Sequence, residues 1–111
     1  MTIRPKNATC FVNTDVEFRC GSDTRFADTG EPVPVNWEFD GLKQCIYCAG
    51  ELNHVYERRY SVNTSVTGVY ILRVGNITQN DAGVYKCINN AGFGPEEAVA
   101  ELIIVGKNEQ Y

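Results

Sequence analysis

Short runs in which hydrophobic and polar residues alternate recur along the chain. In residues 15–20, Val16, Phe18 and Cys20 fall on one side and the charged residues on the other. A period of two with one charged side predicts half-buried strands of an antiparallel sheet. Two further runs, residues 35–39 and 70–74, alternate in the same way. Their hydrophobic positions are Val35, Trp37, Phe39, Tyr70, Leu72 and Val74.

Turn-forming residues separate these runs, and no helical period of useful length is visible. Several short strands between turns predict an all-β domain, either a two-sheet sandwich or a barrel. The 111 residues show no repeat, linker or low-complexity segment, so we expect residues 1–111 to form one domain. The clusters rich in Gly, Asp, Asn, Pro, Ser and Thr are residues 21–32, 40–41, 63–68, 75–83 and 89–97.

Cysteine, tryptophan and tyrosine mark the core of the predicted sandwich. Cys20 and Cys87 lie near its two ends, and Trp37 lies between them in an alternating run. Tyr85 precedes Cys87 by two positions, so both face inward, and the Tyr85 hydroxyl can reach back to the preceding corner. Asp81 begins that corner.

These residues resemble the immunoglobulin superfamily. The resemblance rests on Cys20, Trp37, the spacing of Leu72, Val74 and Ile77, and the pattern Asp-x-Gly-x-Tyr-x-Cys at residues 81–87. It implies a two-sheet antiparallel sandwich with Greek-key connections and a Cys20–Cys87 disulfide across the core. The resemblance also implies that Trp37, Leu72, Val74 and Tyr85 pack around this disulfide.

The long interval between the two core cysteines resembles the variable-type set, which has two extra strands. The sequence Arg59-Tyr60-Ser61 resembles the Arg-aromatic-Ser that opens a strand in variable-type domains, and the resemblance implies an ion pair between Arg59 and Asp81. Residues 93–94 with 98–105 loosely resemble the final strand. An intermediate set with less regular edge strands is the alternative.

Composition indicates an extracellular protein. The net charge is −4 with no basic run, so we expect no nucleic-acid partner, and no stretch of 18 apolar residues suggests a membrane span. Five cysteines favour an oxidising compartment. Three glycosylation sequons, at Asn7, Asn63 and Asn76, agree with this reading. The alternative is an intracellular domain with accidental sequons.

Three cysteines remain outside the core: Cys10, Cys45 and Cys48. A redox pair at Cys45 and Cys48 would need a helix N-terminus, which the pattern lacks. A zinc site with His54 would lack a fourth ligand unless Cys10 comes near. A second structural disulfide is favoured, and all three pairings remain open. A Cys45–Cys48 bridge would require a bend or a bulge.

No arrangement typical of catalysis is visible, so we predict neither an enzyme, nor a cofactor, nor a metal site. On the strand before Cys87, Lys86 and Ile88 should point outward, beside Glu38 of the Trp37 strand. Tyrosine-rich, partly apolar surfaces are typical of interfaces. The predicted binding residues are Glu38, Tyr47, Tyr56, Lys86, Ile88 and Phe93, although some of these rings could instead fold into the core.

We therefore expect an extracellular recognition module of a cell-surface receptor, such as an adhesion or self-recognition receptor. It would bind another protein through its front sheet, and would be attached to the membrane only by a segment outside this sequence. The narrower expectation is that it binds the same domain on an apposed cell. Glycans at the three sequons would leave the front sheet bare. The alternative is a structural spacer module without a specific ligand, in an ectodomain or an intracellular filament protein.

Overall fold

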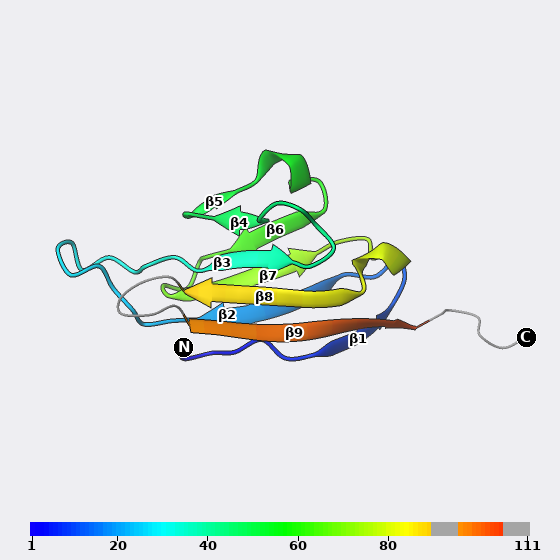
Figure 1. Cartoon of the computed structure of the whole chain (residues 1–111), viewed down its shortest axis with the longest axis horizontal. Helices are drawn as coiled ribbons and strands as arrows, with labels where there is room; N and C mark the ends of the chain where they lie inside the picture. The colour runs from blue at the N-terminus through cyan, green and yellow to red at the C-terminus, as the bar shows by residue number, and fades with distance from the viewer. Residues whose placement is uncertain (90–95, 106–111) are drawn as a thin grey trace, which may run out of the picture.

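The computed structural model describes residues 1–89 and 96–105, so the predicted anchor Phe93 lies outside the described residues. Two sheets pack face to face (Figure 1). One has six strands in the order β1-β9-β8-β3-β4-β5, and the other has three in the order β2-β7-β6. Within the described part of the chain, no helix is of a length and hydrophobicity suited to crossing a bilayer.

The six-stranded sheet consists of β1 (Ala8–Phe11), β9 (Glu96–Val105), β8 (Gly83–Asn89), β3 (Asn36–Phe39), β4 (Tyr47–Cys48) and β5 (Glu51–Leu52). The three-stranded sheet consists of β2 (Val16–Gly21), β7 (Val69–Val74) and β6 (Tyr60–Asn63). Two 3-10 turns, η1 (His54–Tyr56) and η2 (Gln79–Asp81), connect strands of different sheets.

The all-β immunoglobulin-like sandwich is confirmed, with one difference in strand direction. Every neighbouring pair of named strands is antiparallel except β1 and β9, which run parallel with Ala8 opposite Leu102 and Phe11 opposite Val105. The six-stranded sheet is therefore mixed, whereas the sequence predicted antiparallel sheets. The pairing joins residues from opposite ends of the chain, which no local pattern reveals.

The Cys20–Cys87 disulfide joins β2 of one sheet to β8 of the other, with a Cα–Cα distance of 6.5 Å. Both cysteines and Trp37 are fully buried. The bridge closes a loop across 67 positions, which stabilises the fold by about 4 kcal/mol through lost freedom of the unfolded chain. This predicted disulfide is confirmed.

Tyr85 connects the core to the corner before β8. Its hydroxyl donates a hydrogen bond to the Asp81 carbonyl oxygen over 2.7 Å. Its ring stacks on Phe39 at a centroid distance of 4.3 Å and on Phe18 at 5.0 Å. Burial raises the pKa of the Tyr85 hydroxyl far above its usual value, so this group stays a hydrogen-bond donor at every physiological pH.

The short strands β4 and β5 extend the six-stranded sheet beyond β3. A disulfide joins Cys45 to Cys48 over a Cα–Cα distance of 6.2 Å, while Cys10 is a free, half-buried thiol. The chain bends at Ile46, as this pairing requires. Ala49 and Gly50 both have positive φ, 53° and 82°, which is the backbone of a two-residue type I′ hairpin turn.

The prediction that Tyr47 is an exposed binding anchor is wrong. Tyr47 is only 8% exposed and lies opposite Trp37 in the β3–β4 register. Because directly opposed residues of paired strands face the same side of a sheet, Tyr47 must point into the core with Trp37. There its ring lies 6.2 Å from that of Tyr70.

Candidate protein-binding surface

The outer side of the six-stranded sheet is the candidate site, and we call it the front face. Along β8 and β9, residues that point away from the core alternate with buried residues that point into it. The buried residues include Tyr85, Cys87, Ala98 and Ala100. The front face comprises Phe11, Glu38, Lys86, Ile88, Glu97, Val99, Glu101, Ile103 and Val105.

Four large hydrophobic residues on the front face are exposed to solvent. Phe11 is 52% exposed, Val99 55%, Ile103 48% and Val105 37%. Phe11 lies opposite Val105, and Ile103 lies two positions before Val105 on the same strand. Phe11, Ile103 and Val105 are neighbours on this side of the sheet, and Val99 lies further along the same side of β9, beyond Glu101. We call these four residues over β1 and β9 the exposed hydrophobic row.

Charged residues border this row on β8 and β3. Lys86 lies opposite Glu38 in the β3–β8 register, and its ammonium is 3.7 Å from the Glu97 carboxylate. Both partners are substantially exposed, so the pair contributes at most about 1 kcal/mol. Lys86 thus has an ion-pair partner, Glu97, in its own chain.

The structure brings only part of the predicted binding set together. Glu38, Lys86 and Ile88 lie on the front face and are partly exposed. Tyr56 does not join them: it is half-buried in η1, and its ring meets Tyr60 of the other sheet edge-on at 5.9 Å. The expectation that some of these rings fold inward therefore holds for Tyr47 and, in part, for Tyr56.

Sequence reasoning missed the four residues of the hydrophobic row. Residues 102–105 are Leu-Ile-Ile-Val, so both sides of this strand are apolar where alternation would leave one side polar. That run was a usable signal for an apolar outer surface. Such a run is also typical of a strand that is buried on both sides, so the run alone did not show that one side of it faces solvent.

The sequons lie partly as expected. Asn63 ends β6 and Asn76 follows β7, and both are exposed on the three-stranded side. Asn7 is different, because it directly precedes β1, and its side-chain oxygen accepts a hydrogen bond of 2.8 Å from the Glu101 backbone N–H. Asn7 therefore lies at the border of the front face, and a glycan there would not leave all of this sheet bare.

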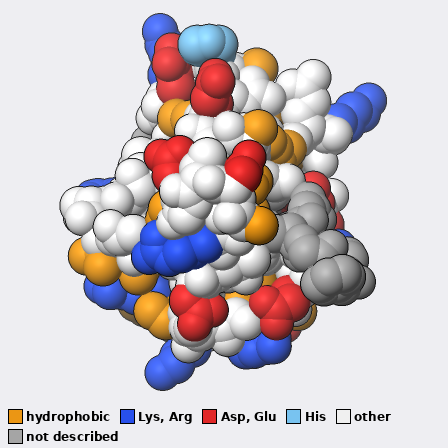
Figure 2. All heavy atoms as spheres, turned by 90° about the vertical axis from the view of Figure 1, so that its left-hand side faces the viewer, with side chains coloured by type: hydrophobic (Ala, Val, Ile, Leu, Met, Phe, Trp, Pro, Cys, Tyr) orange, Lys and Arg blue, Asp and Glu red, His pale blue; other side chains and the backbone are white. Residues whose placement is uncertain are grey.

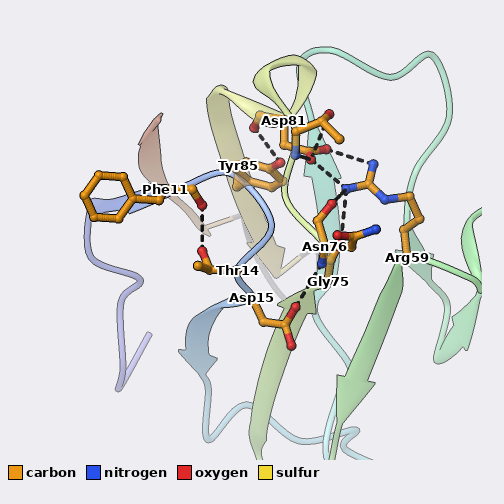
Figure 3. A network of polar contacts seen from close by, with 9 residues as sticks. Phe11, Thr14, Asp15, Arg59, Gly75, Asn76, Asp81 and Tyr85 are labelled. Carbon is orange, nitrogen blue, oxygen red and sulfur yellow. Dashed lines mark hydrogen bonds and ion pairs between the residues drawn. The ribbon is translucent and has the colours of Figure 1, made fainter. Parts of the chain in front are cut away.

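The expected Arg59–Asp81 ion pair is present at the end of the sandwich (Figure 3). The guanidinium donates to both Asp81 carboxylate oxygens, over 3.1 and 2.6 Å. It also donates to the carbonyl oxygens of Gly75 and Asn76, at 3.0 and 3.1 Å. The hydrogen bond with Asp81 raises the pKa of Arg59. The contacts fix the start of β6 to the turns before β8.

A second carboxylate, Asp15, holds the same end of the molecule (Figure 3). One Asp15 oxygen accepts the Asn76 backbone N–H over 2.9 Å, and the other accepts a hydrogen bond from Arg73. The Asn76 N–H, followed by Arg73, lowers the pKa of Asp15. Asn76 has a positive φ of 52°, so the Asp15 contact stabilises a turn that a non-glycine residue adopts reluctantly.

The disulfide between Cys45 and Cys48 decides between the alternatives for these residues. A zinc site would need both sulfurs as thiolates, and here they are bonded to each other. His54 is 95% exposed on its side chain, and its nearest charged partner is Glu57 at 3.9 Å. The structure supports a second structural disulfide, with His54 on the surface.

Comparison with known proteins supports the fold. No protein-family profile matches the sequence. The M1 domain of titin has a TM-score of 0.67 and 24% identity, with 95% of this chain and 93% of that domain aligned. One chain of a complex between titin and obscurin-like 1 immunoglobulin domains gives 0.71 and 20%, covering 96% and 93%.

A three-immunoglobulin-domain fragment of titin gives a TM-score of 0.69 and 22% identity over 95% of this chain. This chain spans 31% of that fragment, the length of one of its domains. The chain therefore has an immunoglobulin-like fold. A fold does not determine a function, so the function must be argued from the surfaces of the domain.

Proposed function

We propose that this domain is an extracellular recognition module of a cell-surface receptor, and that it binds a partner protein through the front face. The observation that carries the proposal is the exposed hydrophobic row of Phe11, Val99, Ile103 and Val105. Half of the large exposed hydrophobic residues in the described part of the chain lie in this one row. Hydrophobic surface concentrated in this way, with a charged border, is typical of interaction sites.

The architecture favours a variable-type or intermediate immunoglobulin domain. Variable-type domains carry two additional strands beside the central strands of one sheet. Here β4 and β5 extend the six-stranded sheet beyond β3 in that position. Both have only two residues, which is the reason for keeping the intermediate type as the alternative.

The narrower proposal is homophilic binding to the same domain on an apposed cell. Two disulfides and three exposed sequons suit a glycoprotein of the extracellular face of the plasma membrane. A single contact through such a row would be weak. Many receptors between two membranes would multiply it, because each contact after the first forms at a high effective concentration.

Bead aggregation tests this proposal. Beads that display the domain should aggregate with one another, and Ile103→Asp or Ile88→Asp should strongly reduce aggregation. Ile103→Ala should weaken association by about 1–2 kcal/mol. Val66→Asp is the matched control, because Val66 is 60% exposed in the turn between β6 and β7, away from the front face. Aggregation that survives Ile103→Asp but is lost in Glu17→Ala, on β2, would show that binding uses the three-stranded sheet, and would contradict the proposal.

A purely structural module is the second candidate, and the likeness to titin domains favours it. A spacer would fold and melt normally, and neither front-face substitution would change any association. Expression in secreting cells separates the candidates further. The recognition module should be secreted with glycans on at least Asn63 and Asn76. An intracellular filament domain would be in a reducing compartment, where neither disulfide would persist.

A further inference from the structure

A hairpin formed by residues 23–34 connects β2 to β3 and projects from one end of the sandwich (Figure 1). Four backbone or side-chain contacts hold it in shape. Phe26 N–H donates to Glu31 O and Gly30 N–H to Phe26 O, both at 2.9 Å, and Val33 N–H donates to Thr24 O at 3.0 Å. The Arg25 guanidinium donates to Gly30 O at 2.9 Å. The tip is therefore ordered before any partner arrives.

The tip of this hairpin carries a hydrophobic ring among acidic groups. Phe26 is 47% exposed, and it pairs with Glu31 next to the turn formed by residues 27–29. Asp28 and Glu31 beside it are both exposed. The hairpin holds three acidic side chains, counting Asp23, against the single base Arg25. Figure 2 looks onto this end, where acidic side chains stand near the centre.

A hollow of about 430 Å³ lies on another side of the same molecule, between the N-terminal segment and β2. Its apolar lining includes Ile3, Pro5 and Phe18, of which Pro5 and Phe18 are buried. Figure 2 shows basic and hydrophobic side chains gathered along the lower left margin of the end view.

Three basic residues, Arg4, Lys6 and Arg19, border the hollow, against one acid, Glu17. In the described part of the chain, Lys6 and Arg19 have no ion-pair partner. Arg4 donates only a long hydrogen bond of 3.5 Å, to Glu97 O. The positive charge of this border is thus available to an incoming anion.

The hairpin tip and the border of the hollow carry opposite charge, and the hollow has room for the exposed ring. An apolar cavity of about 150 Å³ already accommodates a benzene ring, so this hollow has room for a phenylalanine side chain and part of its backbone. The acidic residues of the tip would then lie against the basic border. Opposite charges around an apolar contact speed association and select the partner.

We propose that the Phe26 hairpin of one copy of this chain inserts into the hollow of a second copy. The contact is separate from the front face and does not depend on the proposed function. Because donor and acceptor lie on different parts of the surface, each copy keeps one hairpin or one hollow free. A contact of this kind joins copies in a row unless the arrangement closes on itself.

Complementation between two variants tests the proposal. Phe26→Ser removes the inserted ring and leaves the hollow intact, whereas the double variant Lys6→Glu with Arg19→Glu reverses the border and leaves the hairpin intact. Sedimentation velocity should show that each variant self-associates at least tenfold more weakly than the wild type. An equimolar mixture of the two should again form dimers, through the intact hollow of one and the intact hairpin of the other.

Controls separate this contact from folding and from the front face. All sedimentation experiments use the Ile103→Asp background, which removes the proposed front-face contact, so the remaining self-association reports the hairpin and the hollow alone. In that background Val66→Ser, an exposed hydrophobic change in the turn between β6 and β7, should leave self-association unchanged. Raising the salt concentration from 0.05 to about 0.5 M should weaken the wild-type contact, because its charges are exposed. Thermal melts verify that each variant is folded. A wild type that stays monomeric at millimolar concentration, or a mixture of variants that fails to dimerise, overturns the proposal.

Discussion

Asp81 is 2% exposed, so its buried carboxylate must be stabilised by hydrogen-bond donors of the protein. Its oxygens accept two hydrogen bonds from Arg59 and one from the Thr78 backbone N–H at 2.7 Å. A buried charge costs several kcal/mol unless such partners replace the lost water. The short aspartate and the long arginine thus stabilise the corner only as a pair.

Arg59→Ala should lower the free energy of unfolding by about 2 kcal/mol. Removal of one partner from a buried pair costs about 3–5 kcal/mol, and the 36% exposure of the Arg59 side chain reduces this because water can reach the vacated space. Urea denaturation at pH 7 measures the change. The adjacent, exposed Arg58 supplies the control, since Arg58→Ala should stay within about 0.5 kcal/mol of the wild type. Equal effects of the two substitutions would contradict a structural pair.

Asp15 should make stability depend on pH in the acid range. Its pKa is lower in the folded state than the value near 3.9 of an unfolded chain, so its contribution is complete above that value and is lost as the pH falls through the folded pKa. The stability difference between wild type and Asp15→Asn should therefore shrink below about pH 4. Urea melts from pH 7 to pH 3 measure this difference, and one that stays constant over the range would rule out the contact in solution.

Arg73→Gln is the informative companion variant for Asp15. It removes the arginine contact but leaves the Asn76 backbone N–H, which is the larger cause of the lowered pKa. Asp15 should consequently still contribute part of its pH dependence of stability in Arg73→Gln, whereas Asp15→Asn removes the Asp15 contribution completely.

At the scale of elements, the β4–β5 hairpin has very short strands and is stabilised by a disulfide. Each strand has two residues, and an isolated hairpin of this size would not be stable. The Cys45–Cys48 bridge fixes the bend that places Ile46 and Tyr47 in the core. Ile46 N–H donates to Trp37 O over 2.9 Å, and this bond joins the bend to β3.

Replacement of both cysteines, Cys45→Ser with Cys48→Ser, should cost on the order of 2 kcal/mol, because the closed loop is short. Hydrogen exchange should increase in residues 45–52 while β2 and β7 stay protected. The wild-type protein offers an independent check. Mild dithiol treatment followed by alkylation should label the half-buried Cys45 and Cys48 before the fully buried Cys20 and Cys87. Labelling of the core pair first would show that the edge bridge does not protect the fold as described.

At the scale of the molecule, sequence patterns predicted whatever depends on alternation and spacing. Trp37, Leu72, Val74 and Tyr85 are buried where the alternation placed them, and the Arg59–Asp81 pair followed from the family resemblance. The buried positions need only the identity of nearby residues and the period of a strand, whereas the ion pair needed the resemblance.

Features set by distant contacts escaped prediction. Tyr47 faces inward because β4 pairs with β3, where Tyr47 lies opposite Trp37, and three pairings of the remaining cysteines were compatible with the sequence. The hydrophobic row became visible only with the parallel pairing of Ala8 with Leu102, residues near opposite ends of the chain. Register across such separations is decided by the packing of the whole sandwich rather than by any local run.

The parallel pairing of β1 and β9 has a mechanical consequence. β1 is the first strand, β9 is the last described strand, and both run in the same direction (Figure 1). Tension that pulls residue 8 backward and residue 105 forward slides one strand along the other. All hydrogen bonds between Ala8–Phe11 and residues 102–105 then bear the load together, whereas an antiparallel pair held at one end would open bond by bond. We therefore expect single-molecule pulling through residues 8 and 105 to need a larger rupture force than pulling through residues 8 and 102, and equal forces would contradict this shear geometry.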